Sequence, residues 1–481
     1  MNYFVTTSIP YANANPHIGF ALELIQADVL ARAARQQGYE VVFSTGTDEH
    51  GTKIYEKAQE KGVEPSVLTD EMSQSFRDLA EVVNSSHDRF IRTTDKDHEV
   101  RAQKIWKALE ADIYKAQYKG LYCVGCEEYV TEAAAKERGG ECPAHQRPYK
   151  ELEEDNYFFK LSKYQSDIQK AVESDEYQIV PQHRKNEILS VIKDGLDDIS
   201  VSRPADKLPW GVPVPSDKTQ VMYVWFEALM NYITVLGYPD KQDFKDFWPA
   251  NVQVIGKDIL RFHAAIWPGI LLGLGVDLPQ KLYVHGFIDV AGQKMSKSLG
   301  NVVSPKDVVD TYGTDALRYY LLKHIPSSGD GDFTWEKFHD AYTNELGNEL
   351  GNAVQRTVAM IVRYKHGVLP KIARSQHDEA KYHEALEHCQ FDRALEAAWK
   401  MIRGLNQYIE EEKPWQVAKS GDDALLTSIL SHQAASLMQI ANLLQPFLPE
   451  TAGRIEKMLT AEPIVLPDET LFPRIDVPET E

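Results

Sequence analysis

The chain of 481 residues has only four cysteines, no long apolar run and no excess of positive charge. Four cysteines are too few for a secreted disulfide scaffold and favour a reducing, cytosol-like compartment. No apolar stretch approaches the roughly 18–20 residues that a membrane-spanning helix needs. The chain enters a β-branched, aromatic segment almost at once, without the charged and apolar regions of a signal peptide. The sequence therefore predicts a cytoplasmic protein without a membrane anchor.

Acidic residues outnumber basic ones, and the formal net charge is −20. This balance argues against nonspecific binding to nucleic acid, but it leaves room for a local basic track that contacts one shaped RNA. A hydrophobic content of 43% and a charged content of 26% are those of an ordinary globular protein. The length allows two or three domains.

A strand, a turn and a helix follow one another at the start of the chain. Residues 3–8 are β-branched and aromatic, and the run from Pro16 has helical periodicity, with Asn15 suited to the N-cap and Pro16 to the first helical position. Such a helix N-terminus in an open α/β sheet binds phosphate. His17 would lie in the first turn and face that ligand. The competing interpretation is a capping or surface histidine.

A second segment places two lysines after a strand end. Residues 282–288 read as a buried strand, and a turn leads to Lys294 and Lys297. Lysines in a loop are usually solvated, but α/β sheets bind ligands at this edge. His17 and the two lysines are therefore predicted to share a polyphosphate.

Three of the cysteines and a histidine form two spaced pairs. Cys123 and Cys126 are followed by Cys142 and His145. Four such ligands fit a tetrahedral, structural zinc ion with no open position. Unrelated thiols and a redox pair are the alternatives, and Cys389 stands alone on a helical stretch, as a core residue does.

Together these motifs resemble the paired signatures of class I aminoacyl-tRNA synthetases, and across residues 3 to about 450 they resemble the methionyl-tRNA synthetase family. The resemblance implies an α/β fold with a Rossmann-like parallel-sheet catalytic domain, split by a zinc-knuckle insertion and followed by an all-α helical bundle. The corresponding ranges are 1–113 and 216–337 for the two catalytic halves, 114–215 for the insertion and 338–481 for the α-helical anticodon-binding domain. The insertion looks like the single-zinc branch and has no room for an editing domain.

The resemblance also implies residue roles in ATP binding. His17, Lys294 and Lys297 would be catalytic, with Mg²⁺ held largely by ATP oxygens. The implied ATP-binding residues are Pro16, His17, Gly19, Asp258, Gly286, Lys294, Ser296 and Lys297. Phe20 departs from the family, which usually has a second phosphate-binding histidine there. We expect another donor, such as Asn13 or Asn15, to replace it.

Three segments, residues 9–11, 224–232 and 255–263, are predicted to form the amino-acid pocket. On helical spacing, Trp225, Ala228 and Tyr232 share one face, as do Ile259 and His263, and aromatic rings suit a thioether sulfur. The family's methionine site corresponds to Ile9, Tyr11, Asp48, Trp225, Ala228, Tyr232, Ile259 and His263. Asp48 would hold the substrate ammonium. The alternatives are core aromatics and, for Asp48, an N-cap of the helix near Lys53.

From about Phe338 the pattern becomes amphipathic and helical, as in a bundle. Asn348, Asn352 and Arg356 share one stripe, and Trp415 begins another helix. The resemblance places these four residues near the tRNA anticodon, where amides and rings read unstacked bases. Helix-surface or core roles are the alternatives.

The implied reaction joins L-methionine to tRNA(Met), initiator and elongator, through methionyl-adenylate. It needs no side-chain nucleophile, because phosphoryl transfer depends mainly on positioning and charge stabilisation. A cysteinyl synthetase would need a zinc ion with an open position, against which the four-ligand knuckle argues. An inactive synthetase-like tRNA-binding protein is the other alternative. We expect no additional C-terminal tRNA-binding or dimerisation domain, and therefore a monomer.

Overall fold

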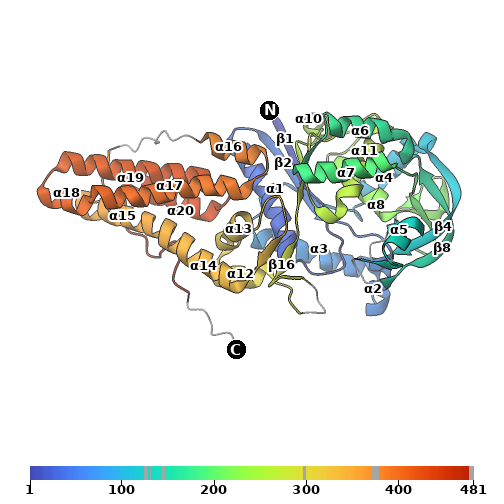
Figure 1. The fold of residues 1–481 in the computed structure, drawn as a ribbon, viewed down its shortest axis with the longest axis horizontal. Helices are drawn as coiled ribbons and strands as arrows, with labels where there is room; N and C mark the ends of the chain where they lie inside the picture. Colours follow the sequence, from blue (N-terminus) through green and yellow to red (C-terminus); the bar gives the residue numbers. More distant parts are fainter. Residues whose placement is uncertain (124–127, 131, 144–146, 296–299, 371–378, 476–481) are drawn as a thin grey trace. The chain divides into compact units, whose positions relative to one another are not determined.

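A computed structural model describes residues 1–123, 128–130, 132–143, 147–295, 300–370 and 379–475 (Figure 1). Internal contacts divide the chain into two compact units. Unit 1 comprises Met1–Pro16, Ala34–Asp78 and Ser86–Val284, and unit 2 comprises His17–Ala33, Leu79–Ser85 and His285–Glu481. Among the described residues, no helix is both long and apolar enough to cross a membrane.

A six-stranded sheet organises unit 1. β1 pairs in parallel with β2 and with β14, β2 with β3, and β15 with β9. In spatial order the strands are β3 (Arg89–Arg92), β2 (Glu40–Thr47), β1 (Asn2–Thr7), β14 (Val252–Gly256), β15 (Lys281–His285) and β9 (Gln178–Val180). β1 therefore lies between β2, which follows it closely in the sequence, and β14, which comes from far along the chain. This is the switch point at which open α/β sheets bind ligands.

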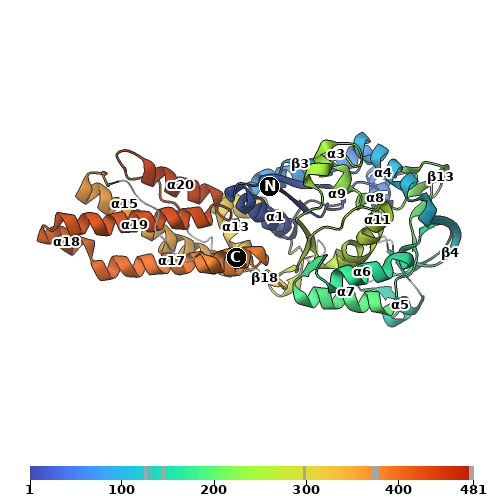
Figure 2. The same cartoon turned by 90° about the horizontal axis from the view of Figure 1, so that it is seen from above.

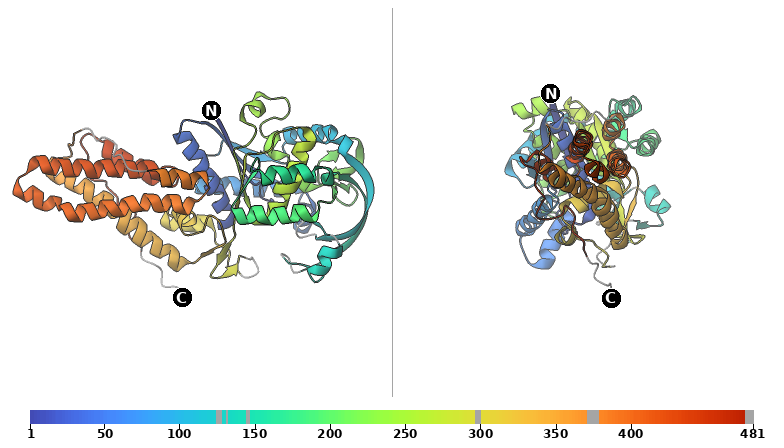
Figure 3. Two further views of the ribbon diagram at one scale, coloured as in Figure 1. Left: turned by 45° about the horizontal axis from the view of Figure 1, so that its top comes forward. Right: turned by 90° about the vertical axis from the view of Figure 1, so that its left-hand side faces the viewer.

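Antiparallel sheets fill much of the region between β3 and β14. The long pair of β4 and β8 curves along one of them (Figure 3, left). The sheets are β10 (Ile199–Ser200), β8 (Lys150–Phe159), β4 (Ile113–Cys123) and β5 (Glu128–Val130); β11 (Ser202–Pro204), β13 (Asp217–Met222) and β12 (Pro213–Val214); and β6 (Glu141–Cys142) with β7 (Arg147–Pro148). β9 also falls inside residues 114–215, yet it belongs to the six-stranded sheet.

The helices of unit 1 surround one large apolar core, in which Trp106, Phe226, Tyr232 and Trp267 are fully or almost fully buried. They are α2 (Thr52–Lys61), α3 (Pro65–Val82), whose last turn belongs to unit 2, α4 (Lys96–Ala108), α5 (Glu132–Glu137), α6 (Gln165–Glu173), α7 (Gln182–Asp194), α8 (Val224–Ala228), α9 (Asn231–Thr234), α10 (Gln242–Phe247) and α11 (Trp267–Leu274). Short helical turns are η1 (Glu110–Asp112), η2 (Leu161–Tyr164), η3 (Lys257–Ile259) and the π-helix η4 (Phe262–Ile266).

Unit 2 contains most of α1 (Ile18–Gln36), a small sheet and a helical bundle. In the bundle α17 lies beside α19, and α15 beside α19 (Figure 2). The remaining elements are β16 (Ile288–Val290), β17 (Gln293–Lys294), β18 (Gly331–Phe333), α12 (Pro305–Tyr312), α13 (Thr314–Lys323), α14 (Trp335–Asp340), the π-helix η6 (Ala341–Gly351), α15 (Asn352–Lys365), α16 (Ala380–Glu387), α17 (Phe391–Glu412), α18 (Pro414–Ser420), α19 (Asp423–Leu444) and α20 (Pro449–Thr460).

A buried arginine joins these parts of unit 2. The Arg318 guanidinium lies 2.8 Å from the Asp28 carboxylate of α1, and both side chains are fully buried. The same guanidinium donates to backbone carbonyls of Val83, Pro446 and Phe447. These bonds satisfy the buried charge, which would otherwise be costly.

Candidate functional site

The carboxyl ends of β1 and β2 are joined in unit 1. The Asp48 amide donates to the Pro10 carbonyl at 2.9 Å, and the Ala12 amide donates to the Asp48 carbonyl at 2.8 Å. These bonds bring the predicted ligand residues Tyr11 and Asp48 into one bridge. Gly51 caps α2, so the prediction that Asp48 caps this helix is wrong. Asp48 therefore lies at the switch-point edge of the sheet, where side chains that bind a ligand are expected.

Two of the predicted pocket aromatics form a hydrogen-bonded pair. The Tyr232 hydroxyl lies 2.7 Å from Nε2 of His263, and Nδ1 of His263 lies 3.0 Å from the Ile259 carbonyl. A carbonyl only accepts, so Nδ1 carries the imidazole proton and Nε2 accepts from the tyrosine. The ring orientation and tautomer of His263 are thus fixed by two partners.

The other pocket candidates are buried or partly buried in unit 1. The Trp225 ring stacks on Phe262 with centroids 4.1 Å apart. Tyr11, Trp225 and Ile259 pack against the core that contains Tyr232. Ala228 is buried in α8, and Ile9 is partly buried just after β1. The predicted helical face over 225–232 spans two short helices, α8 and α9, between which Leu229 and Met230 keep right-handed helical dihedral angles.

Buried acids flank Asp48, and the sequence analysis assigned them no role. Arg92 donates to both Glu49 oxygens, at 2.7 and 2.9 Å. Burial lowers the pKa of Arg92, but its bonds to Glu49 outweigh this and raise it. Glu227 on α8 lies against two histidines, His50 and His98. The sequence signal that could have identified Glu227 is its position as a charged residue inside the apolar run 224–230.

In unit 2, His17 is held by the start of α1. The helix begins at Ile18, so the predicted start at Pro16 with Asn15 as N-cap is wrong. The reason is that His17 caps the helix itself: its carbonyl accepts from Phe20 and Ala21, and its Nδ1 accepts from the Gly19 amide at 3.1 Å. A neutral ring then carries its proton on Nε2, which is the form that donates to a phosphate.

Gly19 and Phe20 fix this histidine sterically. A Cβ atom on Gly19 would lie 2.8 Å from Cε1 of His17, so a side chain there would displace the ring. The Phe20 ring lies 4.6 Å from the His17 ring, tilted by 35°. The segment therefore presents one oriented imidazole.

The remaining nucleotide candidates occupy both units. Pro16 and Asp258 belong to unit 1, whereas Gly286 and Lys294 belong to unit 2. A Cβ atom on Gly286 would lie 2.1 Å from the Gly329 carbonyl oxygen, so glycine is required by close backbone packing. Lys294, at the end of β17, lies over the Phe287 ring at 5.0 Å. Ser296 and Lys297 lie outside the described residues.

Two of the four predicted zinc ligands are described. Cys123 ends β4 and Cys142 ends β6, and both are buried. Cys126 and His145 lie outside the described residues. Cys389 is buried, as predicted, but it lies in the turn after α16, with a φ of 54°, and not on a helix.

The predicted anticodon residues lie in the bundle of unit 2. The Arg356 guanidinium is 5.7 Å from the Trp415 ring centroid and 2.6 Å from the Glu410 carboxylate. Asn348 and Asn352 line a cavity of about 970 Å³ that residues 466–475 also line. The Asn348 amide donates to Asn344 at 3.3 Å.

Comparison with known proteins identifies relatives over nearly the whole chain. The family model of class I tRNA synthetases (M) matches residues 3–151 and 145–358. The methionine–tRNA ligase of Caldanaerobacter subterraneus is 42% identical over 99% of this chain and 79% of its own length. That of Thermotoga maritima is 39% identical over 96% of this chain and 76% of its own.

Solved structures point to the same family as the sequence comparisons. Mycobacterium tuberculosis methionyl-tRNA synthetase, in complex with methionyl-adenylate, matches with a TM-score of 0.90 and 35% identity over 98% of this chain and 100% of that one. The match includes the parallel sheet and the helical region, as the sequence predicted. This chain therefore belongs to the methionyl-tRNA synthetase family of class I aminoacyl-tRNA synthetases.

Proposed function

We propose that this protein is a methionine–tRNA ligase that works in two steps. A carboxylate oxygen of L-methionine attacks the α-phosphorus of ATP, the bond to the β-phosphate oxygen breaks, and pyrophosphate leaves. A terminal ribose hydroxyl of tRNA(Met) then attacks the carbonyl carbon of methionyl-adenylate, loses its proton, and releases AMP. The observation that carries the proposal is the joined edge of β1 and β2, where Tyr11 and Asp48 meet near the core of Tyr232.

The amino-acid roles follow from this edge. Asp48 accepts charge-assisted bonds from the substrate ammonium. Tyr232 and His263 receive the thioether, with Trp225 and Tyr11 as aromatic walls and Ile9, Ala228 and Ile259 as apolar lining. Sulfur near aromatic rings gains about 0.3–1.5 kcal/mol per contact.

The nucleotide roles follow from the His17 segment. The Nε2–H of His17 donates to a phosphate oxygen, and Lys294 and Lys297 stabilise the charge that develops on the departing pyrophosphate. The backbone at Pro16, Gly19 and Gly286 and the side chains of Asp258 and Ser296 complete the binding of ATP. Mg²⁺, which prefers phosphate oxygens and water, accompanies ATP.

A structural zinc ion is proposed for Cys123, Cys126, Cys142 and His145. Two thiols buried at the ends of β4 and β6 in a polar region fit this role, because such a region has little apolar core of its own. The zinc takes no part in the reaction.

The anticodon of tRNA(Met) is proposed to bind at Asn348, Asn352, Arg356 and Trp415. The guanidinium of Arg356 lies over the Trp415 ring within cation–π range, and both are groups on which unstacked bases can stack. We expect a cytoplasmic monomer, and light scattering on the purified protein would test the oligomeric state.

Amino-acid-dependent exchange of pyrophosphate into ATP tests the proposal. Exchange with methionine and not with cysteine or other amino acids supports it. Exchange with another amino acid would indicate a different class I synthetase, and tRNA binding without any exchange would indicate an inactive tRNA-binding protein.

A further inference from the structure

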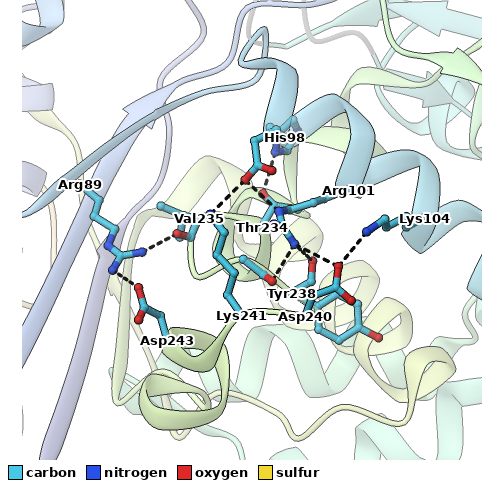
Figure 4. Close-up of polar contacts among 12 residues, drawn as sticks. Arg89, His98, Arg101, Lys104, Thr234, Val235, Tyr238, Asp240, Lys241 and Asp243 are labelled. Atoms are coloured by element: carbon cyan, nitrogen blue, oxygen red, sulfur yellow. Dashed lines mark hydrogen bonds and ion pairs between the residues drawn. The ribbon is translucent and has the colours of Figure 1, made fainter.

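A buried histidine on α4 bridges the two short helices that carry pocket residues. Nε2 of His98 lies 2.6 Å from Oε1 of Glu227 on α8, and Nδ1 lies 2.7 Å from the Thr234 hydroxyl on α9. The His98 side chain is fully buried, and that of Glu227 is 1% exposed. Figure 4 shows the bond to Thr234, with α4 beside the 234–243 segment.

The two bridged helices are too short to hold themselves. α8 has five residues and α9 has four, and isolated helices of that length are unstable in water. α8 carries Trp225 and Ala228, and α9 carries Tyr232. Their relative position is set by Leu229 and Met230, which link them in the right-handed helical conformation, and by tertiary bonds, of which His98 supplies one to each helix.

The same carboxylate reaches the Asp48 segment. Oε2 of Glu227 lies 3.3 Å from Nδ1 of His50, two residues after Asp48. The His50 ring lies 5.6 Å from that of Trp210, whose indole N–H donates to the Glu49 carbonyl at 2.6 Å. A shift of α8 would thus also disturb the segment that carries Asp48.

Glu227 can hold this position as an anion. Burial favours its neutral form, but His50 and His98 outweigh burial and lower the pKa of Glu227 to about 2. Charge-assisted bonds of this kind are stronger than neutral ones and lose more when one partner is removed.

Two residues further along α4 provide a contrast. Arg101 donates to the carbonyls of Gly237 and Tyr238, each at 2.7 Å, and Lys104 contacts Asp240 at 2.7 Å (Figure 4). Half of the Lys104 side chain is exposed, so its pair contributes little. These bonds hold the backbone after residue 235 and do not reach α8.

We propose that His98 is a positioning residue for the amino-acid site, which keeps α8, α9 and, through Glu227 and His50, the Asp48 segment in register. The inference rests on the proposed function. It predicts that loss of the two His98 bonds weakens methionine binding while ATP binding is retained.

The test measures methionine-dependent pyrophosphate exchange in His98→Leu, His98→Gln and Lys104→Ala. Leucine fills the space without hydrogen bonds, whereas the glutamine amide can donate to Glu227 and bond to Thr234. For His98→Leu we expect the KM for methionine to rise about 10- to 100-fold and that for ATP to stay within about twofold. His98→Gln is expected to recover much of the loss, and Lys104→Ala to leave both KM values unchanged. If His98→Leu does not fold, the ratio of the KM for methionine to the KM for ATP in His98→Gln decides between the outcomes.

Equal changes in both KM values, or a lower melting temperature with unchanged KM values, would overturn the inference. So would a glutamine variant as impaired as the leucine one. Absence of exchange in the unmodified protein would refute the proposed function instead, and the inference with it.

Discussion

The hydrogen bond between Tyr232 and His263 permits a sharp test of substrate discrimination. In Tyr232→Phe the donor to Nε2 of His263 is lost. The imidazole cannot exchange its tautomer to compensate, because Nδ1–H is already donated to the Ile259 carbonyl. Tyr232 and His263 are 1% and 2% exposed, so water does not readily replace the hydroxyl. A buried group left unsatisfied costs about 1–3 kcal/mol.

Part of this cost should fall on methionine itself. Because the one hydroxyl proton of Tyr232 is donated to Nε2 of His263, the thioether sulfur, a weak acceptor, would share this proton in a three-centre bond, whereas the corresponding methylene of norleucine accepts nothing. A net hydrogen bond contributes about 0.5–1.5 kcal/mol, which corresponds to roughly 2- to 10-fold in affinity. Since a shared bond contributes less than a full one, we expect kcat/KM for methionine to fall further than kcat/KM for norleucine, by at most about 10-fold.

The assay is pyrophosphate exchange with each amino acid, together with thermal unfolding. Tyr177→Phe is a matched control, because the buried Tyr177 hydroxyl donates to the backbone carbonyl of the same His263 at 2.9 Å. Tyr177→Phe should lower the stability of the protein and leave the ratio of kcat/KM for methionine to kcat/KM for norleucine unchanged. If Tyr232→Phe also lowers only the stability, Tyr232 is a core residue and the proposed thioether contact is wrong.

Three further predictions concern other parts of the chain. Gly19→Ala displaces the His17 ring and should lower turnover about 10²- to 10³-fold, as the loss of one transition-state donor does, with the KM for methionine unchanged in exchange assays. The purified protein should contain one zinc ion per chain by elemental analysis, and Cys123→Ser should lose it and melt at a lower temperature. Burial raises the pKa of Asp315 to about 6, against an ordinary value of 3.8, so its contribution to stability is greatest below about pH 4 and is lost as the pH rises through 6. Urea denaturation should show that Asp315→Asn removes this loss, which amounts to roughly 3 kcal/mol, and parallel pH profiles for the two proteins would contradict the assignment.

Local sequence signals located the first strands and the turns that follow them well, whereas residues 282–288, predicted as one strand, are divided between β15 and the start of β16. The β-branched run at 3–8, the turn to Tyr11 and the strand before Asp48 all lie where expected. They succeed because alternation and turn chemistry are local properties. Periodicity did not resolve the break between α8 and α9, nor the π-helical turns of η4 and η6, because an apolar stripe is compatible with several helical windings.

The buried network could not be predicted in this way. His98 and Glu227 are 129 residues apart, and His50 and Glu227 are 177 apart. No local pattern encodes such pairs, since they arise only when the sheet brings distant segments together. A charged residue within an apolar run, as at Glu227, indicates that a partner exists but not which residue it is.

Phe20 acquires a different meaning from the structure. As a departure from the family pattern it removes one phosphate donor, and whether Asn13 or Asn15 replaces it stays a prediction. Its ring, however, lies against the His17 ring. A second contact, the hydrogen bond from the Gly19 amide to Nδ1, also holds the imidazole. An imidazole that is held on two sides loses less conformational freedom when it binds a phosphate, and preorganised donors contribute most in the transition state. The segment therefore offers one oriented donor where two are usual, and its activity should depend on that orientation as much as on the histidine itself.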